Sequence, residues 1–166
     1  MAATHEEPYV FQSGKYIGKA VEEVIFRDPS FVARLLSYRE QGRAGNNSLY
    51  EHLDLLMEKI PETKTKCPVC GEKSVKYFLF LNSEDIYDTL VCCENADCKS
   101  HLRVNHPNDY LLPIKLSSLL SFRQKRLRKS FIALIKKTVG LRKVDPIKIH
   151  EIFIGNQFKS QLTINF

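Results

Sequence analysis

Two groups of cysteines constrain what this chain can fold into more than any other feature of its sequence. The first group is CPVCG, in which two residues separate Cys67 from Cys70. The second group is VCCENADC, which contains Cys92, Cys93 and Cys98. Closely spaced thiolate pairs that a fold brings together are typical of a tetrahedral zinc site. The cysteines therefore predict a small metal-binding module in the middle of the chain.

The segment between the two groups predicts a β-hairpin. VKYFLFL (75–81) and IYDTLVC (86–92) are rich in strand-forming residues, and the polar segment NSED joins them. Successive side chains of a strand face opposite ways, so only one of Cys92 and Cys93 can point at a metal. We favour Cys93, because Asn95 can then fold the ENAD turn by capping local backbone N–H groups. Cys92 would then be a small buried hydrophobe.

The predicted site holds one Zn²⁺ ion through four thiolates, from Cys67, Cys70, Cys93 and Cys98. Four protein ligands leave no open coordination position, so the ion would be structural and not catalytic. Its binding would supply much of the folding free energy of the module. Three alternatives stay open: Cys92 as the ligand in place of Cys93, His101 or His106 in place of one thiolate, and a metal-free cluster of reduced cysteines.

These residues resemble a known zinc finger. CPVCG, the hairpin, and CENADC followed by a polar–apolar strand are similar to the finger of the phage Ogr/Delta transcription activators, over about residues 67–105. The resemblance implies Zn²⁺ ligands at Cys67, Cys70, Cys93 and Cys98, and a role in DNA recognition or in contacts with the transcription machinery. The longer C-x₅-C spacing that begins at Cys92 resembles instead the topoisomerase zinc ribbons.

A glycine-punctuated turn near the amino end, SGKYIGK, is a second candidate site. Gly14 and Gly18 permit a positive φ, and Lys15 and Lys19 stand on either side of Tyr16. Two lysines around an aromatic ring suit a phosphate backbone with a stacked base. The alternative is a hairpin in which the glycines serve only the turn and Tyr16 packs on the core.

This turn and the residues after it resemble the small domain at the carboxyl end of exodeoxyribonuclease X-type proteins. The resemblance covers about residues 9–38, and the matching residues are Gly14, Lys15, Tyr16, Gly18, Lys19, Glu22, Glu23, Val24, Asp28, Pro29 and Phe31. Ser13 departs from the family, which has an aromatic residue there, and Ile17 replaces a frequent lysine. The family domain accompanies nucleases but does not carry the exonuclease carboxylates.

The net charge of +6 is concentrated in one segment of the chain. Residues 1–109 contain 13 Lys and Arg against 17 Asp and Glu, whereas residues 110–144 contain ten Lys and Arg and no acid. A long amphipathic helix is predicted over 115–140, with a stop at Gly140. Such clustering favours a polyanionic partner. The predicted phosphate contacts are Arg123, Lys125, Arg126, Arg128, Lys129, Lys136 and Lys137. A membrane surface is the lesser competitor.

The remaining segments predict further helices and a second hairpin. Helices are expected over 20–26 and over 48–60. A further helix is expected to begin at Asp28-Pro29, because Phe31, Leu35 and Tyr38 then recur at helical spacing. PIKIHEIFI (146–154) and QFKSQLTI (157–164) flank Gly155-Asn156 and predict a carboxyl-terminal β-hairpin. The expected fold is α+β, in three parts: an exodeoxyribonuclease X-like module (1–62), a zinc ribbon (63–108), and the basic helix with the last hairpin packed on the rest (109–166).

No enzyme class fits the motifs of the chain. The acids are scattered, and the sequence contains no Walker loop, HExxH, nucleophile elbow or zinc-deaminase H-x-E. We therefore expect a non-enzymatic, zinc-containing nucleic-acid-binding protein, with DNA favoured over RNA. It would act in transcription control or in a nucleoprotein complex such as a phage or bacterial defence effector. The amino end lacks the features of a signal peptide, so a cytoplasmic location is expected. The alternative is an adaptor that docks on a nuclease or polymerase subunit.

Overall fold

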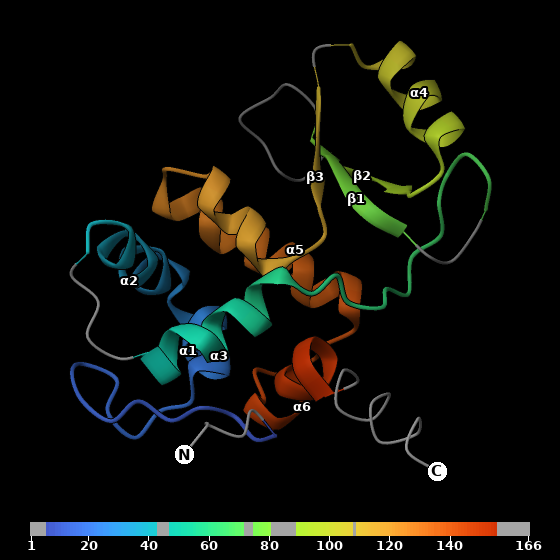
Figure 1. Ribbon diagram of the computed structural model, residues 1–166. Coiled ribbons are helices and arrows are strands. Elements are labelled where there is room, and N and C mark those ends of the chain that lie inside the picture. Colours follow the sequence, from blue (N-terminus) through green and yellow to red (C-terminus); the bar gives the residue numbers. More distant parts are fainter. Residues whose placement is uncertain (1–5, 43–46, 72–74, 81–88, 108, 156–166) are drawn as a thin grey trace.

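The computed structural model describes residues 6–42, 47–71, 75–80, 89–107 and 109–155 and has the predicted mixed α+β class (Figure 1). In chain order its elements are α1 (Val21–Arg27), α2 (Pro29–Glu40), α3 (Asn47–Glu58), β1 (Val75–Phe80), β2 (Thr89–Cys93), α4 (Ala96–Asn105), β3 (Tyr110–Pro113), the 3₁₀-helix η2 (Leu116–Ser121), α5 (Lys125–Val139), α6 (Pro146–His150) and the π-helical turn η3 (Glu151–Gly155). The sheet and α4 lie at one end of the molecule, and the other helices gather at the opposite end.

The sheet has three antiparallel strands in the order β2-β1-β3. β1 and β2 are the two strands predicted for the hairpin, and the NSED connection between them lies outside the described residues. β3 is an additional strand that the sequence did not predict. The register of β1 on β2 shifts between Val75 and Tyr77, so that Val75 lies opposite Cys93 and Tyr77 opposite Cys92.

A cluster of four phenylalanines joins the sheet to α5. Phe78 and Phe80 lie two residues apart on β1 and therefore face the same side of the sheet. The Phe131 ring of α5 lies 6.0 Å from Phe78 and 5.3 Å from Phe122 between ring centroids, and Phe80 lies 5.6 Å from Phe122. All four side chains are buried. Edge-on and tilted aromatic pairs of this kind add about 1 kcal/mol each beyond their buried area.

The helix predicted over 115–140 is interrupted, and this corrects the sequence prediction. The chain forms η2 first, passes through an extended Phe122 (φ −100°, ψ 128°), and only then begins α5. The extended backbone at Phe122 lets its ring enter the aromatic cluster, and the Arg128 Nε donates to the Phe122 carbonyl oxygen at 2.8 Å. Burial of this ring outweighs the helical preference of the local sequence.

The first half of the predicted carboxyl-terminal hairpin is also wrong, because residues 146–155 are helical. α6 begins at Pro146, and the Asp145 side chain caps it by accepting from the Ile147 N–H at 3.0 Å. Burial of Ile149 and Phe153 accompanies the helical turns. The second predicted strand (157–164) lies outside the described residues.

The face of α2 that enters the core is not the one that carries the apolar stripe seen in the sequence. Helix α2 begins at Asp28-Pro29 as expected, with the Asp28 side chain accepting from the Phe31 N–H at 3.2 Å. Its buried residues are Pro29, Val32, Ala33 and Leu36. The stripe of Phe31, Leu35 and Tyr38 lies on the opposite side of the helix, where the first two are half-buried and Tyr38 is 45% exposed.

A buried polar cluster connects α1, α3 and α6. The Glu22 Oε1 forms a hydrogen bond with the Nε2 of His52, and the rings of His52 and His150 meet edge to face at 5.7 Å. All three side chains are almost fully buried. Burial lowers the pKa of His150 from its usual value, an effect that nearby His52 reinforces and nearby Glu22 opposes. The folded state therefore favours a neutral His150.

None of the described helices combines the length and the apolar character that are needed to cross a bilayer.

The lowered pKa of His150 predicts that folding stability decreases as the pH is lowered below about 6.5. The unfolded chain takes up a proton at His150 near that pH, whereas the folded chain does not until a lower pH, so acid favours unfolding. The slope from this group is at most about 1.4 kcal/mol per pH unit. Urea unfolding over a pH series should give a flatter profile for His150→Leu than for the wild type. Parallel profiles would contradict the prediction.

Candidate metal centre and nucleic-acid interface

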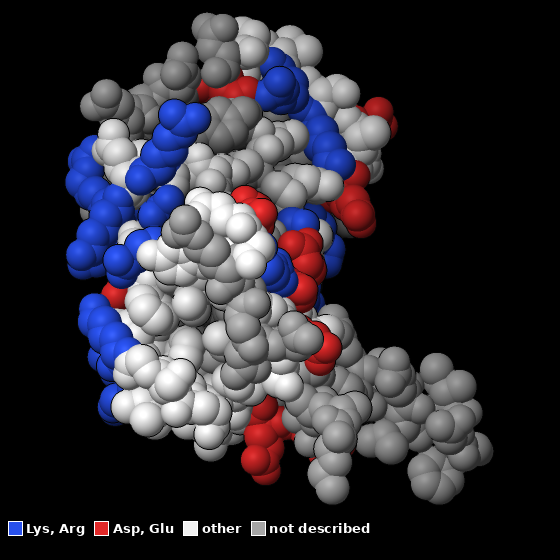
Figure 2. Space-filling view, turned by 60° about the vertical axis from the view of Figure 1, so that its left-hand side comes forward, with Lys and Arg blue, Asp and Glu red and all other residues white. Residues whose placement is uncertain are grey.

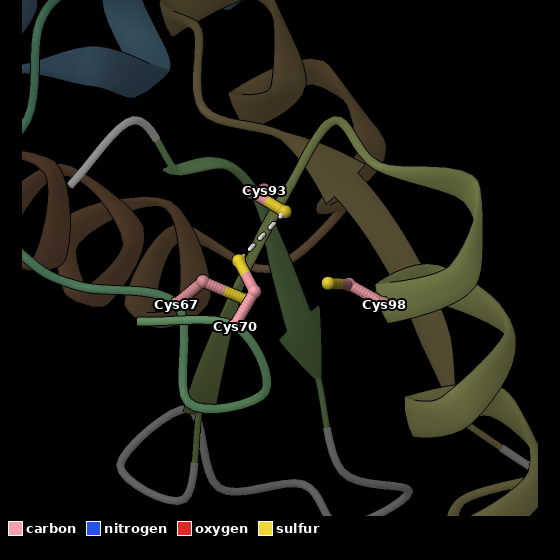
Figure 3. A group of neighbouring side chains, drawn as sticks. All are labelled: Cys67, Cys70, Cys93 and Cys98. Atoms are coloured by element: carbon pink, nitrogen blue, oxygen red, sulfur yellow. Dashed lines mark hydrogen bonds between the residues drawn. The ribbon is translucent and has the colours of Figure 1, made fainter. Parts of the chain in front are cut away.

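Four cysteine sulfurs form one cluster at the end of the sheet (Figure 3). The Sγ atoms of Cys67, Cys70, Cys93 and Cys98 all lie within 4.8 Å of one another. Cys67, Cys93 and Cys98 are buried, and Cys70 is exposed at the edge of the cluster. These are the four predicted ligands, brought together from three separate parts of the chain.

Two tight turns and the end of a strand position the four thiols. In CPVCG, the Gly71 N–H donates to the Cys67 carbonyl at 2.9 Å, and Gly71 adopts φ 78°, a conformation that favours glycine. Cys93 is the last residue of β2. The Asn95 side chain then accepts from the Asp97 N–H at 2.9 Å and caps α4, whose first turn carries Cys98.

The polar–apolar strand expected after CENADC is a helix instead. Residues 96–105 form α4, which buries Cys98 and Leu102. The Asn95 cap that the sequence predicted for a turn therefore begins a full helix. Helix α4 also contacts the sheet, because the Lys99 Nζ lies 4.2 Å from the ring centroid of Tyr77 on β1.

Cys92 and Cys93 separate as strand geometry predicts. Cys92 is fully buried outside the cluster, and its Sγ donates to the Cys93 carbonyl oxygen at 3.3 Å. Burial, reinforced by the nearby Cys67 and Cys93 thiols, raises the pKa of Cys92 to about 11. Cys92 is not among the cysteines whose sulfurs gather in the cluster.

The electrostatics of the cluster favour a bound cation. Burial by itself would raise the pKa of Cys67, but the backbone N–H groups of Cys70, Cys93 and Val69 outweigh it and lower that pKa to about 6. Burial and the neighbouring thiols raise the pKa of Cys98. Without a cation, the buried thiols therefore resist simultaneous ionisation. A divalent ion at the centre would stabilise all four thiolates together.

The spacing of the sulfurs fits a metal ion better than a disulfide. The Sγ atoms of Cys70 and Cys93 are 3.7 Å apart. A tetrahedral ion with metal–sulfur bonds of about 2.3 Å places its sulfurs about 3.8 Å apart. A disulfide needs about 2.05 Å. The four cysteines could therefore coordinate one metal ion such as zinc.

The two histidines considered as alternative ligands lie outside this cluster. His101 is exposed on α4, 3.4 Å from the Asn105 side-chain nitrogen. His106 follows α4, with its Nδ1 3.3 Å from the Asp109 carboxylate. Among the described residues, the candidate metal-binding group consists of the four cysteines and includes no histidine.

Helix α5 carries most of the predicted phosphate contacts on one side. Residues of an α-helix follow one another at about 100° around the axis, so that five cations fall within a sector of about 120°: Lys125, Arg126, Lys129, Lys136 and Lys137. The buried residues of α5, which include Phe131 and Ile135, occupy the other side. Figure 2 shows Lys and Arg side chains gathered along one edge of the molecule, with most of the visible acids elsewhere.

Arg128 differs from the other cations of α5, because it lies in the buried sector. Its guanidinium donates to the Phe122 carbonyl at 2.8 Å, and its Nη1 lies 3.4 Å from the Ser30 hydroxyl of α2. This arginine therefore connects α5 to α2 and is half-buried. The sequence alone did not distinguish it from its neighbours in R-Q-K-R-L-R-K.

The glycine-lysine turn lies beside the amino end of α2. Gly14 and Gly18 have the predicted positive φ (86° and 80°). The Tyr16 hydroxyl donates to the Asp28 carboxylate at 2.6 Å, and its ring packs edge-on against Phe31 at 4.7 Å. Tyr16 is therefore half-buried, in the position that the alternative interpretation of the turn expects.

Asp28 brings the two predicted basic sites together. The Lys15 Nζ lies 3.6 Å from its carboxylate. Burial would raise the pKa of Asp28, but the hydrogen bonds from Tyr16 and Phe31 and the charges of Lys15 and Lys125 outweigh it and lower that pKa. The first turn of α5 and the glycine-lysine turn therefore act on the same carboxylate. Lys19 is exposed at the other end of the turn, and Arg123 is exposed just before α5.

Compared with known proteins, the chain matches no family model, no curated protein and no solved structure. The resemblances to the Ogr/Delta finger and to the exodeoxyribonuclease X-type domain therefore remain predictions from the sequence.

The geometry of the cluster predicts that Cys93→Ser abolishes metal binding and unfolds the module around it. Structural zinc contributes about 10 kcal/mol or more to such modules, which exceeds the stability that a small sheet has by itself. Metal analysis of the purified protein should give one zinc per wild-type chain and none for Cys93→Ser. Cys92→Ala is the matched control and should keep its zinc. Loss of zinc from Cys92→Ala, with retention in Cys93→Ser, would contradict this assignment.

Proposed function

We propose that this protein is a non-enzymatic nucleic-acid-binding protein in which a structural zinc ion holds a ribbon-like module against a basic helix. The observation that carries the proposal is the one-sided arrangement of cations on α5, in a segment without acids. The basic surface, as we use the term, consists of Arg123, Lys125, Arg126, Lys129, Lys136 and Lys137, with Lys15 beside it.

The dimensions of the basic surface suit a phosphate backbone. From Lys125 to Lys137 the helix extends about 18 Å. The phosphates of one DNA strand rise about 3.4 Å per nucleotide, so several of them would lie within reach of these side chains. Like charges at this density repel one another, and a polyanion would relieve the repulsion.

A zinc ion would act on this surface indirectly. The cysteine cluster lies at the Val75 end of β1, and Phe78 and Phe80 of the same strand pack on Phe122 and Phe131. An ion that holds the end of the strand would therefore also stabilise the apolar side of α5. We place the site residues of the proposal in two groups: thiolates that fold the module, and exposed cations that bind.

The setting that we propose is transcription control or a nucleoprotein complex. The likenesses to the Ogr/Delta finger and to the exodeoxyribonuclease X-type domain point in the same direction, toward DNA-handling proteins of phages and bacteria. A protein adaptor that docks on an acidic nuclease or polymerase subunit is the competing function, and the test below separates the two.

The test compares two charge-reversal variants of the same net charge. Arg126→Glu/Lys129→Glu removes two cations from the basic surface and avoids Arg128, which holds α5 to α2. Lys66→Glu/Lys148→Glu reverses two exposed lysines of other segments. Binding to labelled single- and double-stranded DNA and RNA is measured by anisotropy over a series of salt concentrations.

We expect the first variant to bind more weakly and its log–log salt slope on duplex DNA to be smaller in magnitude by about two. The control variant should bind like the wild type. If the wild type and both variants gave identical binding curves, the basic surface would not be the nucleic-acid-binding site. A stoichiometric complex with a protein partner that survives high salt, without binding to any nucleic acid, would favour the adaptor.

A further inference from the structure

A pocket lies on the side of α2 that faces away from the core. Phe31, Leu35 and Tyr38 recur on this side, and together with Arg34 and Lys15 they line a pocket of about 240 Å³. An apolar stripe at this spacing normally packs on a core. Here the core takes mainly the opposite face of the helix: Phe31 and Leu35 pack only partly against it, and Tyr38 is 45% exposed.

The lining of the pocket combines aromatic rings with two cations. The Arg34 guanidinium carbon lies 5.9 Å from the ring centroid of Phe31. The Lys15 side chain is 63% exposed, with its Nζ 5.0 Å from the ring centroid of Tyr16. No acidic residue is among the described residues that line the pocket. The site therefore favours a ligand that is both flat and anionic.

We propose that this pocket holds one unpaired nucleobase against Tyr38 and Phe31, with the adjoining phosphate between Lys15 and Arg34. The inference rests on the proposed function and makes it more specific, because it names single-stranded nucleic acid as the preferred ligand. A base in a duplex is stacked on both faces and paired along one edge, so it cannot enter a pocket on a helix surface, whereas an unstacked base can.

The size of the pocket supports a single ring system. Sites for whole small-molecule ligands occupy about 300–1,000 Å³, and this pocket is smaller. A nucleotide that is part of a chain needs no larger site, because its neighbours bind elsewhere.

The position of the pocket favours a nucleic acid over a phosphotyrosine peptide, which is also flat and anionic. Lys15 lines the pocket and lies 3.6 Å from the Asp28 carboxylate, and helix α2 packs on α5, the helix of the basic surface. Ser30, one residue before Phe31, contacts Arg128 of α5. A strand whose base occupies the pocket would therefore continue along the cations of α5, so repeated phosphates match this surface better than one phosphate does.

The test separates base recognition from phosphate attraction. Short labelled single strands of DNA and of RNA are compared with the same strands in which every base is replaced by an abasic sugar, and with the duplex. Binding is measured with the full chain over a series of salt concentrations, and the strands are compared with one another at the same ionic strength. The wild type should bind the base-bearing strand about tenfold more tightly than the abasic strand.

Substitutions at Tyr38 test whether the pocket causes this preference. Tyr38→Ala should remove most of it and leave the salt slope unchanged, whereas Tyr38→Phe should retain it, because the ring stacks and the hydroxyl does not. Leu120→Ala is the matched control: Leu120 is 44% exposed, as Tyr38 is 45% exposed, and lies on η2 outside the pocket. This control should behave like the wild type.

The other possible outcomes show whether the pocket inference, the proposed function or both are wrong. Equal affinity of the wild type for base-bearing and abasic strands, with salt-dependent binding intact, would overturn the pocket inference and leave the proposed function standing. A preference that survives in Tyr38→Ala would also overturn the inference. Absence of binding to any strand or duplex would overturn both. If a phosphotyrosine peptide binds more tightly than the single strand, and if Tyr38→Ala abolishes that binding, the pocket would be assigned to a peptide.

Discussion

The packing of β1 on α5 through four phenylalanines is the interaction on which the rest of the structure depends. Phe78 and Phe80 project from one face of the strand onto Phe122 and Phe131. Because this contact takes the apolar side of α5, most cations of the helix, though not Arg128, lie on its other side. The same strand begins beside the cysteine cluster, where Val75 pairs with Cys93. One element therefore connects the candidate metal centre to the candidate binding surface, and neither is independent of the other.

Several charged residues of the sequence motifs hold the fold together. Arg128 joins α5 to the Phe122 carbonyl and to α2. Asp28 caps α2 and accepts the Tyr16 hydroxyl. Glu22 lies buried against His52. These contacts give several residues of the exodeoxyribonuclease X-like pattern a structural role that needs no bound ligand. They also narrow the proposed interface to the exposed cations, such as Arg126 and Lys129.

Local signals predicted the elements whose ends are capped by their own neighbours. The Asp28-Pro29 start of α2 was recognised, because a capping carboxylate followed by proline acts over a few residues. The same pair at Asp145-Pro146 begins α6, although the alternating pattern of the residues after it predicts a hairpin. Asn95 was predicted to cap a turn, and the helix that follows it was missed. The interruption at Phe122 could not be predicted, because its cause is an aromatic cluster built from distant parts of the chain.

The sequence by itself determined which side chains have the chemistry of a site: the spacing of the four cysteines, the preference for Cys93 over its neighbour from the Asn95 turn, and the row of cations at helical spacing. These depend on covalent spacing and on the period of a helix or strand, which are local properties. Only the tertiary structure decided which face of each helix meets the core. It buried Val32 and Leu36 of α2 and left Tyr38 accessible, and it turned Arg128 inward while Arg126 stayed exposed. Periodicity defines the faces of a helix, but only contacts with distant segments determine which face is covered.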